Sequence, residues 1–480
     1  MTGTLVAGVD CSTQAIKVVV VDADSGKLVA TGRRANEVHR DGPASETNPE
    51  DWWHGLAEAL AQTGLAAEIG AISIAAQQLG LVTLDARHRP VRRAVLWDDT
   101  RSADAAIALR DSLGGAEGWA RHVETQPLAG MTVCSWAWLK AAEPDLAAST
   151  AHIRLPHDFL TERLTGHGTT DRGDASGSGW WSTRREGYAS EVLSLVGLDE
   201  GMLPRVFGPD DTAGDVRADA ARHCGLRSGI PVACGTGDNM AAALALAVEP
   251  GTPVISLGTS GTAYARSALP FADASGQVIA GASASGDYLP LTCTLNATLA
   301  VDNLAGLLGL DRDAVAETTH AVTMPYLSGE RLPNYPLARG TIAGIDHDTT
   351  PGEILLAAYE GVAYSLVRSL ETLHSHSSGI DEEAPIVLVG GGARGMIWQK
   401  TIARLSGRRI LIPACDELVA WGAAAQAGGL LLNRPAVEVA HHWNISQGPE
   451  LPAMDTDTET LERIGRVRAA AHEMNSQALF

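Results

Sequence analysis

The sequence predicts an α/β fold made of two related halves. Short apolar runs alternate with stretches of helical periodicity along most of the 480 residues, which is typical of α/β domains. An apolar strand, a polar turn and a second apolar strand open the chain at residues 5–22, and the same arrangement recurs at residues 253–265. A chain of this length usually forms more than one domain. We therefore expect two domains, comprising residues 1–246 and 247–480.

The composition restricts the class of protein. Hydrophobic residues make up 45 % of the chain and the formal net charge is −21, which together exclude a disordered chain and argue against nucleic acid as a partner. No secretory signal and no apolar stretch of membrane-spanning length is visible, so we expect a cytoplasmic protein without membrane contact. The six cysteines are scattered singly, without the close spacing of a zinc site or a disulfide framework, and are predicted to be buried thiols.

The individual elements follow from local patterns. In the first half, a hairpin is followed by a helix with an apolar stripe and then by a buried strand. In the second half, a hairpin is followed by a long periodic helix, an apolar strand that ends in glycines, and a helix with small residues on most faces. The expected ranges are 5–10, 17–22, 49–64 and 71–75 in the first half, and 253–265, 353–373, 385–389 and 420–431 in the second. A charged terminal helix is expected within residues 452–480.

Three short turns are built mainly from Gly, Ser and Thr, which offer backbone N–H groups and hydroxyls without bulky side chains, as phosphate-binding turns do. The first contains Asp10, Ser12, Thr13 and Gln14, with Lys17 shortly after; the second contains Gly258, Thr259, Ser260 and Gly261; the third contains Gly390, Gly391, Gly392 and Ala393. The GxxxxGK[ST] motif of a P-loop is absent, and no GxGxxG dinucleotide motif opens a helix after the first strand. We expect instead that two opposed hairpins bind the phosphates of a nucleotide from both sides of a cleft between the domains.

Two carboxylates end apolar strands. Asp238 follows a Gly-rich turn near the domain boundary and is interpreted either as the cap of a helix beginning at Asn239 or Met240, or as a general base in the cleft. Asp10 has a similar ambiguity between a turn residue and a carboxylate for magnesium. Sequence position alone leaves both pairs of alternatives open.

Several ordered motifs resemble the FGGY family of carbohydrate kinases, and within it the xylulokinases. Residues 10–17 resemble the first phosphate hairpin of the family, 235–239 the catalytic segment, 256–261 the second phosphate hairpin, and 390–393 the turn at the adenosine end of ATP, while residues 340–360 match a family signature throughout. The resemblance covers essentially the whole chain. It implies two actin-like, ribonuclease H-like α/β domains with the active site in the cleft between them.

The resemblance also implies an activity, namely ATP-dependent phosphorylation of a ketopentose by in-line phosphoryl transfer, with D-xylulose converted to D-xylulose 5-phosphate. Asp238 would be the general base and Asp10 the Mg²⁺ ligand, while Thr13, Thr259 and backbone N–H groups would hold the phosphates of ATP. Lys17 would either assist them or lie on the hairpin surface. The sugar would bind in the N-terminal domain near Gln77, Gln78, Leu79, Trp97, Asp98 and Asn239. A homodimer is common in the family and is expected here.

Departures from the family pattern concern the sugar site. The segment Ala76–Gly80 has Leu79 where the xylulokinases usually have a sugar-contacting His, and Asp98 stands where Asn is usual. The loss of one polar partner in a buried site costs about 1 to 3 kcal/mol, enough to change substrate preference. A kinase for another ketose or a polyol is therefore an alternative. A nucleotide-binding, actin-like protein without kinase activity is a second alternative, against which the presence of Asp238 argues.

Overall fold

The computed structural model describes residues 4–327, 329–331, 335, 338–376 and 380–476. The chain forms two compact units. Unit 1 contains Met1–Val248, Pro270–Leu289 and Glu417–Ser446, and unit 2 contains Glu249–Leu269, Pro290–Asp416 and Gln447–Phe480. One division thus falls after residue 248, but two segments from later in the chain also belong to unit 1, so neither unit is a single uninterrupted stretch.

The main sheet of unit 1 contains the predicted opening hairpin. Strand β1 (Leu5–Cys11) pairs antiparallel with β2 (Ala15–Asp22) and parallel with β6 (Ile69–Ala76). The strand order is β14-β15-β6-β1-β2-β3, and the two-residue strand β16 (Thr236–Gly237) also pairs parallel with β6. The remaining strands of this sheet are β3 (Leu28–Ala35), β14 (Thr212–Asp215) and β15 (Pro231–Ala233).

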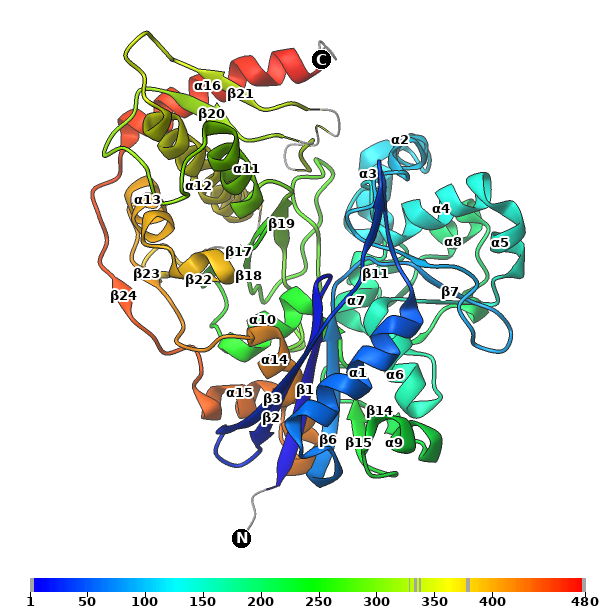
Figure 1. The fold of residues 1–480 in the computed structure, drawn as a ribbon. Helices are drawn as coiled ribbons and strands as arrows, with labels where there is room; N and C mark the ends of the chain where they lie inside the picture. The colour runs from blue at the N-terminus through cyan, green and yellow to red at the C-terminus, as the bar shows by residue number, and fades with distance from the viewer. Residues whose placement is uncertain (1–3, 328, 332–334, 336–337, 377–379, 477–480) are drawn as a thin grey trace. The chain divides into compact units, whose positions relative to one another are not determined.

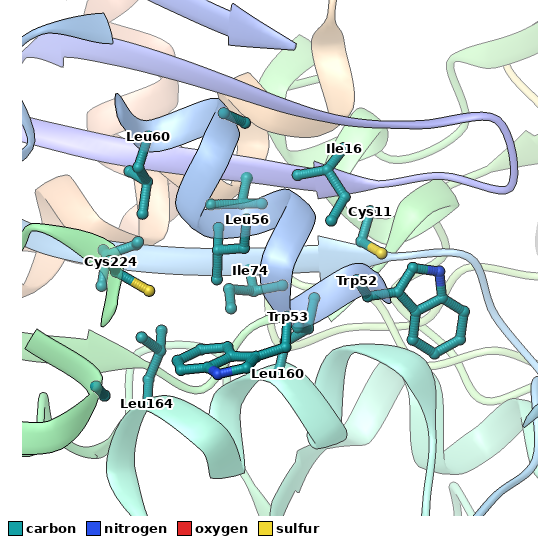
Figure 2. Packing of buried hydrophobic residues seen from close by; sticks show 14 of the residues in the cluster. Cys11, Ile16, Trp52, Trp53, Leu56, Leu60, Ile74, Leu160, Leu164 and Cys224 are labelled. Atoms are coloured by element: carbon teal, nitrogen blue, oxygen red, sulfur yellow. The ribbon is translucent and has the colours of Figure 1, made fainter. Parts of the chain in front are cut away.

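Helix α1 (Pro49–Thr63) covers one face of this sheet, and its bounds agree with the predicted range (Figure 1). The Asn48 side chain caps its N-terminus, and Gly64 ends it in the left-handed conformation. Its apolar stripe, which includes Trp52 and Leu56, is buried against β1 and β6 together with Leu160 of α6 (Pro156–Thr165), as Figure 2 shows. Cys224, at the end of α9 (Ala218–Cys224), closes this core from the same face.

Helix α14 (Leu418–Leu432) covers the opposite face, because Ala7 and Val9 of β1 point into the α1 core while Gly8 points toward α14. A Cβ atom at Gly8 would lie 1.9 Å from the carbonyl oxygen of Ala420. The small residues noted in this helix therefore allow backbone to pack directly on backbone, and they place a late segment of the chain in unit 1.

Unit 2 is built on a second mixed sheet in the order β19-β18-β17-β22-β23-β24. The predicted second hairpin is present as β17 (Pro253–Leu257) and β18 (Gly261–Ala265), and β17 pairs parallel with β22 (Ile386–Val389). The predicted long helix is α12 (Pro351–His376). The other elements of the sheet and its cover are β19 (Leu291–Thr294), β23 (Ile410–Leu411), β24 (Glu450–Leu451), α11 (Thr298–Leu308), α13 (Met396–Ser406) and the terminal α16 (Thr458–Ser476).

Shorter elements complete both units. Helix α7 (Arg172–Gly177) follows β10 (Thr169–Asp171), and α10 (Asp238–Leu246) follows β16. The others are β4 (His39–Asp41), β5 (Ala44–Thr47), β7 (Val82–Leu84), β8 (Ala94–Val95), β9 (His152–Arg154), β11 (Trp181–Ser182), β12 (Gly187–Tyr188), β13 (Arg205–Phe207), β20 (Val322–Met324), β21 (Thr341–Ala343), α2 (Ala103–Arg110), α3 (Gly115–Val123), α4 (Thr132–Ala142), α5 (Pro144–Ser149), α8 (Ser190–Val196) and α15 (Ala436–Trp443).

Two further expectations concern the whole chain. All six cysteines are free; five are buried and Cys415 is partly exposed. Among the described residues, no helix combines the length and the apolar character needed to cross a membrane.

Candidate active site

The candidate site of unit 1 lies where three neighbouring parallel strands end. Cys11 of β1 pairs with Ala76 of β6, and Ala76 pairs in turn with Gly237 of β16. The residues that follow these three positions therefore emerge at the same edge of the sheet. They begin the first polar turn, the segment from Gln77, and helix α10 at Asp238. Chain segments separated by more than 200 residues are brought together in this way.

Asp238 is the first residue of α10, and Gly237 occupies the cap position. Its Oδ1 accepts hydrogen bonds from the backbone N–H of Asn239 at 2.7 Å and from the Asn239 Nδ2 at 2.8 Å. The interpretation as the cap of a helix beginning at 239 or 240 is wrong, because the helix already includes Asp238. Burial and the negative charge of Asp10 raise the pKa of Asp238 to about 7, despite the opposing hydrogen bonds from Asn239.

Asp10, near the end of β1, is 3 % exposed. Lys17 Nζ lies 3.4 Å from its Oδ2 and 2.6 Å from Glu417 Oε2. Burial raises the pKa of Asp10 to about 6, an effect that the Lys17 ammonium partly offsets. Its other oxygen, Oδ1, is buried and has no hydrogen-bond partner among the described residues. A buried carboxylate oxygen with free acceptor capacity suits a hard cation such as Mg²⁺.

The first polar turn is tied to the neighbouring strand ends. Thr13 Oγ1 donates to Gln77 Oε1 at 2.9 Å and accepts from Trp97 Nε1 at 3.1 Å. The Ser12 hydroxyl donates to the Ala15 carbonyl within the turn, at 2.9 Å, whereas Gln14 is exposed. The buried Nε2 of Gln77 has no partner among the described residues and is a donor without an assigned acceptor.

Of the remaining residues predicted to bind the sugar, some are connected to Asp238 and others bond elsewhere. Asn239 Nδ2 donates to Gln78 Oε1 at 3.2 Å, which joins the predicted base to the 77–79 segment. Leu79 is buried and adopts a left-handed backbone with φ of 69°, and its carbonyl accepts from Thr132 Oγ1 at 2.9 Å. Asp98 Oδ2 forms an ion pair with Arg40 at 2.6 Å, and its buried Oδ1 has no hydrogen-bond partner among the described residues.

In unit 2, the second and third turns lie together at one edge of the sheet, because Ser256 of β17 pairs with Val389 of β22. The Gly258 carbonyl accepts from both the backbone N–H and the hydroxyl of Thr298, at 3.1 and 2.8 Å. A Cβ atom at Gly390, whose φ is 88°, would lie 2.5 Å from the Leu257 carbonyl oxygen. Glycine is therefore required at this position by both backbone conformation and space.

The other residues of these two turns differ in how far they are available to a ligand. Thr259 and Gly391 are exposed, and among the described residues, the two chain neighbours aside, no atom lies within 4 Å of a Cβ atom placed at Gly391. Ser260 is partly exposed, whereas Gly261, Gly392 and Ala393 are buried. The carbonyl of the buried Ala393 accepts a hydrogen bond from Gln399 Nε2 at 2.8 Å.

A buried group that the sequence reasoning missed lies beside the Asp238 turn. His157 Nδ1 is 2.6 Å from Asp174 Oδ2, and the Thr236 hydroxyl donates to Asp171 Oδ2 at 2.7 Å. The charge of Asp174 also contributes to raising the pKa of Asp238. Residues 170–177 carry family-like sequence, but only the fold brings His157 next to them, so no local pattern could have identified the group.

Two α/β units with Gly-rich turns at their strand ends form the fold, and comparison with known proteins shows which class of protein has it. A family model described as the FGGY family of carbohydrate kinases, N-terminal domain, matches residues 5–245, and the corresponding C-terminal domain model matches residues 254–429. The chain belongs to the FGGY family of carbohydrate kinases. The predicted two-domain α/β fold of this family is thereby confirmed, and membership implies the use of ATP.

Comparison with individual proteins narrows the similarity to xylulose kinases. The chain is 52 % identical over 470 residues to a xylulose kinase of Streptomyces coelicolor, covering 98 % of this chain and 97 % of the relative. It is also 52 % identical over 471 residues to a xylulose kinase of Streptomyces rubiginosus, with the same coverage. The crystal structure of xylulose kinase from Bifidobacterium adolescentis superposes with a TM-score of 0.83 at 33 % identity, covering 98 % of this chain and all of the other.

Proposed function

We propose that the protein transfers the γ-phosphoryl group of ATP to the terminal hydroxyl of D-xylulose, giving D-xylulose 5-phosphate. The observation that carries this proposal is the 52 % identity, over nearly the full length, to two xylulose kinases. Phosphoryl transfer depends on alignment of donor and acceptor and on stabilisation of charge rather than on covalent catalysis. The candidate residues supply groups for both tasks.

Asp238 is proposed as the general base. A base that accepts a hydroxyl proton works best when its pKa lies near the working pH, and the pKa of Asp238 is raised to about 7. Asn239 holds the carboxylate by two hydrogen bonds and also contacts Gln78. The proposed base and the proposed sugar segment are thus held by one amide side chain, which restricts how the sugar hydroxyl can approach.

Asp10 is proposed to hold Mg²⁺, since its buried Oδ1 is available. When bound, the ion would neutralise charge on the phosphate oxygens. Lys17 supplies a fixed positive charge beside the same carboxylate. Backbone N–H groups and hydroxyls of the turns at 12–14, 258–261 and 390–393 are proposed to bind ATP. This explains how a chain with a net charge of −21 accepts a polyanion, because the attraction is local.

A second candidate, a kinase for another ketose or a polyol, is favoured by one observation. Leu79 is apolar, so the segment offers no polar side-chain group at this position. Its Cδ2 would lie 2.9 Å from a Cβ atom at Gly177, which shows that the side chain packs against α7. ADP release measured across pentuloses, hexuloses and polyols would separate the two. D-xylulose is expected to give the highest kcat/KM; a rank near the bottom of the panel would overturn the narrower proposal.

Asp238→Asn tests the reaction itself. This variant keeps the size of the side chain but removes the base, so kcat should fall by at least about a thousandfold while ATP still binds in calorimetry. Asp346→Asn, an exposed carboxylate in unit 2, is the control and should retain full activity. Near-normal turnover by Asp238→Asn would exclude the proposed base. We further propose a cytoplasmic homodimer, whose oligomeric state light scattering after gel filtration would test.

A further inference from the structure

Four ionisable side chains are buried together in unit 1 and take no part in the proposed chemistry. His157, Asp158 and Asp174 are 0 % exposed and Asp171 is 2 % exposed. Among the described residues, the ion pairs of these three carboxylates all go to His157, at 3.3 Å for Asp158, 3.9 Å for Asp171 and 2.6 Å for Asp174. Buried charges are retained only where partners compensate for the loss of water. The cluster therefore depends on a single imidazolium.

His157 is an unfavourable residue at this position without those partners. It lies in the first turn of α6, where the partial positive charge of the helix N-terminus opposes a cation. Burial also disfavours the imidazolium, but Asp158, Asp174 and Asp171 outweigh it and raise the pKa of His157 to about 9. The histidine is thus positively charged at neutral pH.

A bound metal ion is a poorer explanation of the cluster. His157, Asp158 and Asp174 could offer three ligand atoms to one ion. However, His157 Nδ1 and Asp174 Oδ2 are 2.6 Å apart, the distance of a charge-assisted hydrogen bond. Two ligands of one zinc ion would be about 3 Å apart or more, given bonds of roughly 2 Å. The contact is therefore a proton-mediated one.

The cluster is joined to the turn that carries Asp238. A Cβ atom at Gly235 would lie 2.8 Å from His157 Cδ2, so the imidazole packs directly on the first residue of the turn. The buried Thr236 hydroxyl donates to Asp171 Oδ2 at 2.7 Å. Asp238 follows two residues later. The backbone before the proposed base thus packs on the imidazole at Gly235 and is bonded through Thr236 to Asp171, a carboxylate that pairs with the same imidazole.

Helix α7 extends the same support to the sugar segment. Asp171 caps this helix by accepting from the N–H groups of Gly173 and Asp174, at 2.8 and 3.0 Å. At its other end, a Cβ atom at Gly177 would lie 2.9 Å from Leu79 Cδ2. The helix is therefore fixed at its start by the cluster and abuts the proposed sugar segment at its end.

We propose that His157 is a positioning residue for phosphoryl transfer, which through Asp171, Asp174 and helix α7 fixes the proposed base and the sugar segment relative to each other. This inference rests on the proposed function, since it assigns no chemistry of its own to His157. Its consequence is kinetic. Loss of the imidazolium should misplace Asp238 against the sugar hydroxyl and lower kcat, while the ATP-binding turns of unit 2 stay unchanged.

The primary variant is His157→Gln, with ADP release measured for the sugar that gives the highest wild-type rate. We expect kcat to fall by about tenfold to a hundredfold, as small misplacements of catalytic groups do, with the KM for ATP unchanged. His157→Lys, which retains a cation, should recover most of the loss. Asp346→Asn, the exposed carboxylate of unit 2 that also serves as the control for Asp238→Asn, should leave kcat unchanged.

Thr236→Val provides a test that does not depend on the folding of the histidine variant. It removes only the hydroxyl that joins the turn to Asp171 and should reproduce the fall in kcat. Since both substitutions break the same connection, the kcat of the double variant should be no lower than that of the less active single variant. Independent, multiplying losses, an unchanged kcat in His157→Gln or Thr236→Val, or one equivalent of metal lost with His157→Gln would each overturn the inference. An inactive wild type would instead refute the proposed function.

Discussion

The pH profile of the reaction tests the placement of Asp238 most directly. Burial and the neighbouring Asp10 raise the pKa of Asp238 to about 7. A general base acts only when ionised, so the enzyme should be active above this pH and lose activity as the carboxylate is protonated below it. The second-order rate constant should fall by about tenfold between pH 8 and pH 6.

Asn239→Ala is the perturbation that separates Asp238 from other titrating groups. The substitution removes the hydrogen bond from Asn239 Nδ2 to Asp238 Oδ1 but keeps the one from the backbone N–H. A hydrogen bond to a charged group contributes about 1.5 kcal/mol, which corresponds to about one pH unit. Because this bond favours the ionised form, its loss should move the acidic limb upward by about that amount.

The assay is initial-rate ADP release from pH 5.5 to 9, with both substrates below their KM values so that the free enzyme is reported, and with Mg²⁺ in excess so that ATP stays ionised. Asn303→Ala, an exposed residue of α11, is the matched control and should keep the wild-type profile. A wild-type rate that is flat between pH 6 and pH 8, or a limb that does not move in Asn239→Ala, would refute the reasoning.

Three further outcomes are expected. Gly391→Ala should leave the melting temperature unchanged and raise the KM for ATP, because a Cβ atom there meets only open space; Gly390→Ala should destabilise the fold by about 1 to 3 kcal/mol through its φ of 88° and the Leu257 carbonyl. In chemical denaturation, Gly8→Ala should cost about 3 kcal/mol or more, whereas Gly306→Ala, in open space on α11, should be neutral or stabilising by up to about 1 kcal/mol. Leu79→His should change the ranking of sugars in the substrate panel, because His tolerates a positive φ better than Leu and adds a polar group.

The features predicted best from the sequence are those set by residues close together in the chain. The two hairpins, α1, α12 and the Gly-rich turns follow from apolar periodicity and turn residues within a few positions of one another. Asp238 directly follows such a turn, which makes it a candidate, but its place as the first residue of α10 rather than its cap depends on where the helix begins. The exact first residue of a helix depends on how the helix packs in the fold, and a local sequence pattern carries no information on that packing.

The sequence could not predict contacts that the fold creates between distant segments. The position of Glu417 beside Lys17 and the membership of α14 in unit 1 both join residues about 400 positions apart. The His157 cluster likewise depends on contacts of His157 and Asp171 with the turn at Gly235 and Thr236, which lies more than 60 positions further along the chain. In each case the residues are ordinary in their local sequence, and only their shared burial makes them notable.

Helix α14 shows why these distant contacts matter for the proposed chemistry. Asp10 and Asp238 belong to different elements, β1 and α10, and α14 packs against both of them. A Cβ atom at Gly8 would lie 1.9 Å from the Ala420 oxygen, and one at Gly422 would lie 1.9 Å from the Ala241 oxygen, so backbone meets backbone on each side. Gln426 Nε2 also donates to the Gly235 carbonyl at 3.2 Å. Because backbone contacts cannot adjust by a change of rotamer, this one helix fixes the separation of the two carboxylates, and Gly8→Ala should reduce kcat as well as stability.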